Sequence, residues 1–156
     1  MPNAELKEIV WVDNFYQLKR TAANFSGLPY LAVDTESNSL FAYQEQVCLI
    51  QFSNETDDYL IDPLAISDLS PLEPVFADPR TEKIFHAAEY DIICLKRDFG
   101  FRFENIFDTM VAARILGRPA VGLGSVLEAE FGISLDKRYQ RANWGQPPLP
   151  PAQKSY

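Results

Sequence analysis

The chain has 156 residues, a length that predicts a single domain. Hydrophobic residues make up 47% of it and charged residues 23%, which is ordinary for a globular chain with a core. The longest apolar runs are too short to span a bilayer and no signal segment opens the sequence, so we expect a cytoplasmic protein without membrane attachment. The net charge of −8 argues against nucleic-acid binding through a broad basic surface. It leaves room for a nucleic-acid site in which divalent metals supply the positive charge.

The cysteines and the single histidine indicate what kind of metal chemistry is available. Cys48 and Cys94 both lie in apolar stretches, which predicts buried thiols in a reducing compartment rather than a disulfide framework. His86 ends a predicted strand among apolar residues, and we interpret it as a packed, hydrogen-bonded side chain. One histidine excludes a zinc cluster built from histidine and cysteine.

The first part of the chain predicts strands at residues 8–12, 30–35, 47–53 and 58–61. Between the first two, Asp13 is a candidate cap for an amphipathic helix that ends before the next strand. The short connections between the last three strands predict an antiparallel meander.

A different pattern follows a short helix near residues 71–76. A strand at residues 83–86 leads into a helix at residues 88–98. At about 100° per residue, one apolar stripe of that helix contains Ala88, Ile92, Leu95 and Phe99.

Two further helices complete the predicted elements. Asp108 is expected to cap a helix that ends at Leu116, and another helix spans residues 123–131. The prolines between residues 147 and 151 are expected to exclude regular structure. A three-strand meander followed by strand–helix units predicts an α/β fold, with a mixed sheet flanked by helices.

Two carboxylates close the second predicted strand. Asp34 and Glu36 are two residues apart, so both project from the same face of the strand. Like charges at that distance repel each other unless a cation or a proton intervenes, and hard oxygen ligands suit Mg²⁺ or Mn²⁺. Taken alone, the pair is also consistent with a solvated strand end.

A third carboxylate lies on the helix at residues 88–98. Asp91 is about 60° from the centre of the apolar stripe, so it can face the sheet instead of water. The alternative is an ordinary first-turn aspartate, stabilised by the helix dipole.

Four collinear segments resemble a known family. LAVDTES with VCLIQFS is similar to the first exonuclease motif of the DEDD superfamily, and HAAEYDIICLKRDFG to the second. FENIFDTMVAARILG and LGSVLEAEFGISLDKRYQRANW follow in the register of ribonuclease D-like 3′-5′ exonucleases. The resemblance extends from Leu31 to the C-terminus and implies a ribonuclease H-like fold.

The resemblance implies catalytic roles for particular residues. Asp34, Glu36 and Asp91 correspond to the first three acids that bind two Mg²⁺ or Mn²⁺ ions, and Asp34 bridges both ions. Tyr156 matches the tyrosine of the third motif, Tyr-x-x-x-Asp, and is expected to orient the attacking water. The fourth acid would lie four residues beyond it. We therefore expect residues 1–156 to be a C-terminally incomplete exonuclease domain with weak activity or none.

The expected reaction releases 5′-mononucleotides from the 3′ end of a single strand, with RNA expected rather than DNA. Two alternatives remain open: a DNA-directed exonuclease of the same superfamily, and an inactive domain that binds nucleic acid. For Asp108, the cap accounts for the residue, although a supporting role at the metal site stays open.

A basic, aromatic segment is the best local candidate for contact with the strand. Lys137, Arg138 and Arg141 could hold phosphates, while Trp144 could stack on a base. The alternative is a solvated loop that Trp144 anchors to the core.

Overall fold

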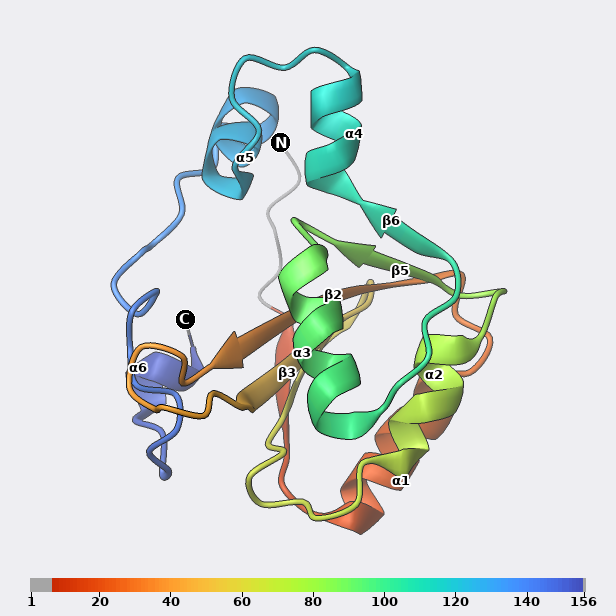
Figure 1. Ribbon diagram of the computed structural model, residues 1–156. Coiled ribbons are helices and arrows are strands. Elements are labelled where there is room, and N and C mark those ends of the chain that lie inside the picture. The colour runs from red at the N-terminus through yellow and green to blue at the C-terminus, as the bar shows by residue number, and fades with distance from the viewer. Residues whose placement is uncertain (1–6, 156) are drawn as a thin grey trace.

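The computed structural model describes residues 7–155, and in that range six strands form one mixed sheet (Figure 1). The strands are β1 (Glu8–Val12), β2 (Tyr30–Ser37), β3 (Val47–Ser53), β4 (Asp57–Ile61), β5 (Glu82–Phe85) and β6 (Ile106–Asp108). Their order across the sheet is β1-β4-β3-β2-β5-β6. The predicted meander is confirmed, because β2, β3 and β4 pair antiparallel. All other pairs are parallel: β1 with β4, β2 with β5 and β5 with β6.

The described helices surround this sheet. They are α1 (Phe15–Phe25), the 3₁₀ turn η1 (Ser70–Leu72), α2 (Glu73–Ala77), α3 (Glu89–Phe99), α4 (Thr109–Ile115), α5 (Leu123–Phe131) and α6 (Pro151–Lys154). None of the helices in residues 7–155 is long and apolar enough to cross a membrane. The predicted α/β fold with a mixed sheet and flanking helices is confirmed.

Helices α1, α2 and α3 pack on one face of the sheet, which we call the core face. Its largest side chains are aromatic, and Phe76 of α2 lies among Phe52, Phe101 and Phe103 at ring distances of 5.5, 5.1 and 4.8 Å. The apolar stripe predicted for α3 contacts this core, and Leu95 is fully buried there.

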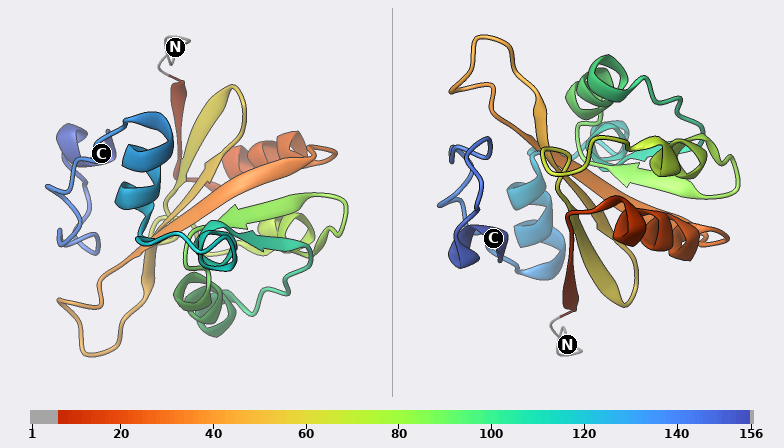
Figure 2. Two further views of the ribbon diagram at one scale, coloured as in Figure 1. Left: turned by 90° about the horizontal axis from the view of Figure 1, so that it is seen from above. Right: turned by 90° about the horizontal axis from the view of Figure 1, so that it is seen from below.

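The C-terminal segment covers part of the opposite face, which we call the site face. Figure 2 shows this segment on one side of the strands, away from α1 and α3. Trp144 and Leu149 are buried there and pack with Cys48, Leu49 and Leu60 of the sheet. This second apolar cluster holds a segment that has little regular structure of its own.

Three sequence expectations about the elements are wrong in detail. The side chain that caps α1 is Asn14, which accepts from the Gln17 amide at 3.0 Å, and not Asp13. Strand β6 was missed, because three residues are too short to show a periodicity. The prolines do not exclude regular structure, since α6 begins at Pro151. A proline at the first helical position loses no hydrogen bond that the helix needs.

Candidate active site

Parallel pairing of β2 with β5 brings the three predicted carboxylates to one place. Ala32 pairs with Ile84, so both strands run toward the same edge of the sheet. Helix α3 begins four residues after the end of β5, and Asp91 lies in its first turn. The first turn of α3 therefore lies beside the end of β2, where Asp34 and Glu36 are located.

A bulge changes the course of β2 at this edge. Glu36 pairs with Leu49, but the next residue, Ser37, pairs with Val47, so β3 has one extra residue at Cys48. Bulges increase the local twist and redirect side chains, and they are common beside active sites. The bulge lies immediately after Glu36, where the loop that contacts α3 begins.

The turn between β5 and α3 is held by Asp108. Its carboxylate accepts from the amides of Ala87 and Ala88 at 3.1 and 2.9 Å, and it also caps α4 through Met110 and Val111. Ala87 has a φ of 63°, a conformation that costs energy for a side chain with a Cβ. Burial acts to raise the pKa of Asp108, but these amide donors outweigh it and the pKa is lowered. The prediction that Asp108 is a cap is confirmed.

The environment of Asp34 and Glu36 in β2 destabilises their ionised forms, which raises their pKa values. Burial, followed by the charge of Asp91, raises the pKa of Asp34 to about 6, although the Thr35 amide acts against this. Burial, followed by the charges of Asp34 and Asp91, raises the pKa of Glu36 to about 8. Burial also raises the pKa of Asp91. The charge of Asp91 thus acts on both acids of β2, whereas the charge that raises the pKa of Asp91 is that of Asp108.

Thr35 determines where the Asp91 carboxylate is held. Its hydroxyl donates to Asp91 at 2.5 Å, and strand alternation directs it to the face opposite Asp34 and Glu36. In the described part of the chain, no group of three or more histidine, cysteine or acidic side chains is drawn together tightly enough to hold a metal ion by itself. The donor set nevertheless fits a hard divalent cation, because it consists of carboxylate oxygens whose repulsion such an ion would relieve.

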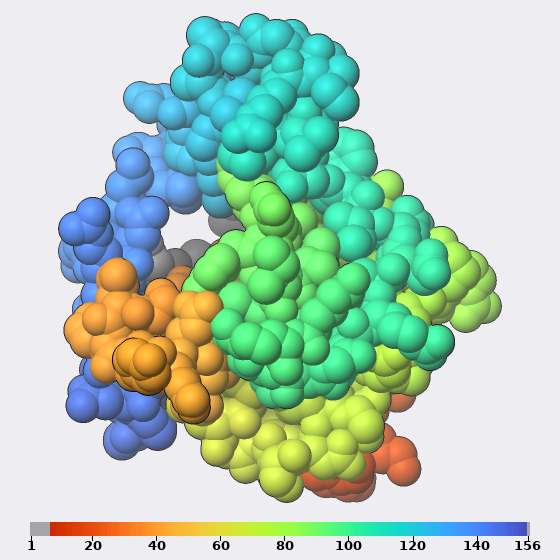
Figure 3. Space-filling model, viewed as in Figure 1, coloured from red at the N-terminus to blue at the C-terminus, as the bar shows by residue number. Residues whose placement is uncertain are grey.

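A hollow of about 500 Å³ opens on the site face beside Asp34. Asp34 lines it together with His86, Gln51, Gln153 and Lys154. Water reaches the Asp34 side chain there, yet the surrounding protein lowers the local dielectric, which explains how an accessible carboxyl has a raised pKa. Figure 3 shows an opening between α3, the β2–β3 loop and the C-terminal segment.

Comparison with known proteins identifies the family to which this chain belongs. A family model described as 3′-5′ exonuclease matches residues 9–156. The chain belongs to the 3′-5′ exonuclease family. Such enzymes generally depend on divalent metal ions.

Relatives and solved structures of this family agree with the fold. The chain is 41% identical to "Protein RRP6-like 3" of Arabidopsis thaliana, over 90% of this chain and 16% of that protein. It is 35% identical to the "Exosome complex exonuclease RRP6" of Saccharomyces cerevisiae, over 94% of this chain and 20% of that protein. The chain thus spans about a fifth or less of these relatives.

Two solved structures resemble this one closely. The catalytic core of RRP6 from Trypanosoma brucei has a TM-score of 0.91 and 32% identity, over 96% of this chain and 42% of that one. RNase D of Escherichia coli, described as an exoribonuclease involved in structured RNA processing, has a TM-score of 0.88 and 31% identity. That match covers 97% of this chain and 40% of that one.

His86 of this exonuclease domain is hydrogen-bonded, as predicted. Its Nδ1 lies 2.8 Å from the Thr109 hydroxyl, and that hydroxyl donates to the Phe85 carbonyl at 3.0 Å. The single hydroxyl proton of Thr109 is therefore used, so Nδ1 of His86 carries the proton and donates to Thr109. Its Nε2 is buried and has no partner among the described residues.

The basic, aromatic segment of the exonuclease domain contains both a buried aromatic residue and exposed basic residues. Trp144 is 2% exposed and lies in the apolar cluster of the site face, which supports its alternative role as an anchor. Arg138 is exposed and its guanidinium pairs with Asp136 at 2.7 Å. Lys137 and Arg141 are exposed on the same loop and stay candidates for phosphate contact.

Tyr156, the predicted catalytic tyrosine, lies outside the described residues. The sequence also gave no sign that Thr35 holds Asp91, because that contact joins positions 56 residues apart. It likewise missed a cluster of polar contacts around Glu45 and Arg97, which joins the β2–β3 loop to α3. Contacts between distant residues leave no periodic pattern that could have revealed them.

Proposed function

We propose that this exonuclease-family domain hydrolyses single-stranded RNA from the 3′ end and releases 5′-mononucleotides. Asp34, Glu36 and Asp91 hold two Mg²⁺ or Mn²⁺ ions in this proposal. The observation that carries it is the position of these three acids around the end of β2: burial raises the pKa of each, and the charge of Asp91 raises the pKa of the other two further. A domain that only binds RNA gains nothing from this repulsion.

The chain's own residues hold the site in shape. Thr35 fixes one oxygen of Asp91, and Asp108 fixes the turn from which α3 begins. Asp34 and Glu36 take their positions from the strand itself and from the bulge that follows. Bound divalent ions would activate a water molecule and stabilise the departing 3′ oxygen. Tyr156 is proposed to orient that water through its hydroxyl, since a phenol of ordinary pKa is a poor base at neutral pH.

RNA is proposed over DNA because of the relatives. The bacterial structure is described as an exoribonuclease, and the yeast relative is described as an exosome complex exonuclease. No sequence motif distinguishes an RNA substrate from a DNA substrate, because the 2′-hydroxyl is recognised by local contacts.

We also infer a reducing compartment such as the cytoplasm, since Cys48 and Cys94 are free thiols buried in the fold.

Fluorescence anisotropy with 5′-labelled single-stranded RNA tests this function. Binding should be measurable in Ca²⁺ or Mn²⁺ and nearly absent in chelator at matched ionic strength, because the acidic site repels phosphate without the ions. Asp34→Asn should lose most of the metal-dependent part, and Asp13→Asn is a control with the same charge change away from the site. Binding that chelator does not alter would overturn the proposal and favour an inactive RNA-binding domain. Equal binding of single-stranded DNA would remove the preference for RNA.

A further inference from the structure

The loop between β2 and β3, residues 38–46, leaves the sheet directly after the carboxylate pair and has a defined shape. Its ends are joined by two hydrogen bonds between Asn38 and Gln46, at 3.3 and 2.9 Å. Its tip turns back because the amides of Phe41 and Ala42 donate to the Asn38 carbonyl at 2.8 and 3.0 Å. The loop is therefore a small folded unit at the edge of the site.

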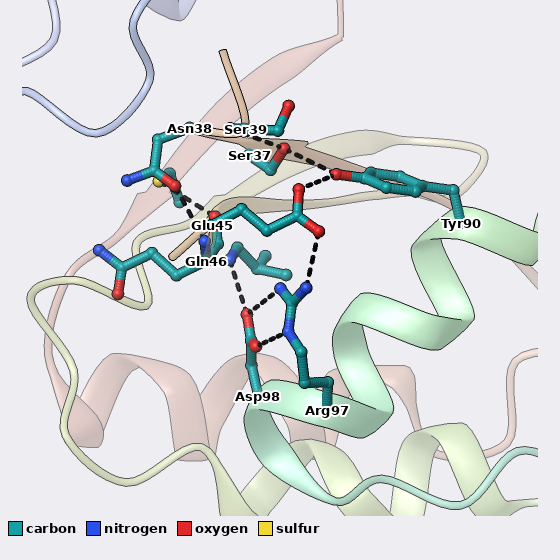
Figure 4. A network of polar contacts seen from close by, with 10 residues as sticks. Ser37, Asn38, Ser39, Glu45, Gln46, Tyr90, Arg97 and Asp98 are labelled. Carbon is teal, nitrogen blue, oxygen red and sulfur yellow. Dashed lines mark hydrogen bonds and ion pairs between the residues drawn. The ribbon is translucent and has the colours of Figure 1, made fainter. Parts of the chain in front are cut away.

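A polar network fastens this loop to α3 (Figure 4). Glu45 accepts from the Tyr90 hydroxyl and, at 2.7 Å, from Arg97. Asp98 accepts from Arg97 at 2.6 Å and from the Val47 amide at 2.8 Å. We call Glu45, Tyr90, Arg97 and Asp98 the clasp.

The clasp also connects two acids of the site. The Tyr90 hydroxyl lies 3.4 Å from the Ser37 hydroxyl, so it contacts the residue after Glu36 and itself precedes Asp91. Hydrogen bonds from Tyr90 and Arg97 hold the pKa of Glu45 below its ordinary value, which keeps its charge at neutral pH. The position of the loop is thereby tied to the positions of Glu36 and Asp91.

The tip of the loop carries apolar side chains that the described protein leaves uncovered. Leu40, Phe41 and Tyr43 are 67%, 54% and 104% exposed. No charged residue occurs between positions 37 and 44. In Figure 3 the loop, drawn in orange, protrudes beside α3 at the rim of the opening. Single exposed apolar residues are common, but three on one four-residue tip form a patch that indicates a binding surface.

We propose that the 38–46 loop is a base-stacking arm for the strand that enters the carboxylate site, and that the clasp holds this arm in place. The inference rests on the proposed function and names Phe41 and Tyr43 as the stacking residues. Its physical basis is the charge of the protein: with a net charge of −8, the protein as a whole repels the phosphates of the strand. Stacking on an aromatic face needs no positive potential and accepts every base.

Affinity measurements with matched aromatic variants test the arm. In Ca²⁺, Tyr43→Ala should weaken binding of 5′-labelled single-stranded RNA by about 5- to 100-fold, and Tyr43→Phe should restore most of it. Tyr16→Ala is the control, because Tyr16 is 70% exposed on α1, away from the site. Phe41→Ala should behave like Tyr43→Ala.

RNA strands with one abasic nucleotide identify the contact directly. At the position that stacks on Tyr43, loss of the base should weaken binding to the unmodified protein, and Tyr43→Ala should then add little.

Glu45→Ala tests the clasp as a positioning element. It should weaken binding by about 3- to 10-fold, because an arm that is no longer held must be ordered on binding. In the Glu45→Ala background, Tyr43→Ala should cost less than in the unmodified protein.

The outcomes separate the arm from the proposed function. RNA binding that depends on metal but responds equally to Tyr43→Ala and Tyr16→Ala would overturn the arm and leave the exonuclease proposal standing. An absence of metal-dependent RNA binding would overturn the proposed function itself. A sedimentation experiment in which Tyr43→Ala abolishes self-association, with RNA affinity unchanged, would assign the patch to a second copy of this chain and overturn the arm.

Discussion

The two faces of β2 carry side chains with opposite energetic effects. Leu31 and Val33 point to the core face and are 0% and 6% exposed, so their burial stabilises the fold. Asp34 and Glu36 alternate with them and point to the site face, where burial and mutual repulsion raise their pKa values. Eight residues of one strand thus contain part of the core and part of the candidate active site. The comparison teaches that apolar residues that stabilise the fold and acids of the candidate site alternate along β2, while Thr35 connects the core face to the site through Asp91.

Truncation of an aromatic residue on the core face should have the largest effect. Phe76→Ala removes a fully buried ring that contacts Phe52, Phe101 and Phe103, so it should lower the free energy of unfolding by about 3–5 kcal/mol. Ile115→Ala, at a position that is 80% exposed, should change it by less than about 0.5 kcal/mol. Urea denaturation measures both.

Asp34→Asn provides the contrast on the site face. In chelator it should leave the free energy of unfolding unchanged or raise it, since it removes one of the repelling charges. A loss of stability as large as that of Phe76→Ala would show that the two faces are not separated in this way.

The pH dependence of the free energy of unfolding should show how much the ionised site acids destabilise the fold. The pKa of Glu36 is about 8 in the folded state, against 4.5 for an unperturbed glutamate in the unfolded chain. Between these pH values the folded protein therefore binds more protons than the unfolded chain. The free energy of unfolding therefore falls as the pH rises from about 4.5 to about 8. Glu36→Gln should flatten this fall by on the order of 1–2 kcal/mol, a figure already reduced because the side chain is partly exposed to solvent.

Denaturation in chelator at a series of pH values, for the unmodified protein and Glu36→Gln, measures this difference. Saturating Mn²⁺ should remove most of the slope in the unmodified protein, because a bound cation favours the charged carboxylates. Parallel curves for the two proteins would mean that Glu36 is not under electrostatic stress.

The sequence was a good guide wherever a local pattern carries the information. The strand at residues 47–53 and the helix at residues 123–131 were predicted with their observed bounds, because each is a continuous run between clear stop signals. The cap of α1 was misplaced by one residue, since Asp13 and Asn14 both suit that position and only the backbone decides between them.

The candidate site was predictable in part. Strand alternation indicated that Asp34 and Glu36 share a face, and helical geometry allowed Asp91 to face the sheet without excluding an ordinary first-turn aspartate. The sequence could not reveal the clasp, in which Glu45 meets Arg97 across 52 positions. Nor could it choose between a stacking and an anchoring role for Trp144, because that choice depends on which face of the sheet the C-terminal segment covers.

Substitution of the basic residues in the C-terminal segment should have the smallest effect of the changes considered. The effect should be on RNA affinity, so it tests whether the site face also binds the substrate. Lys137→Gln and Arg141→Gln should each weaken binding of single-stranded RNA by a few-fold. Each should also reduce the slope of log affinity against log salt by about 0.7, the value for one phosphate contact on a single strand. Arg138→Gln should do less, because its guanidinium is already paired with Asp136 at 2.7 Å. Lys19→Gln, on α1 at the core face, has the same charge change and should alter neither quantity. If Lys19→Gln reduced the salt slope as much as Arg141→Gln, RNA would be responding to the net charge of the protein, and the segment at residues 137–141 would have no special place in its path.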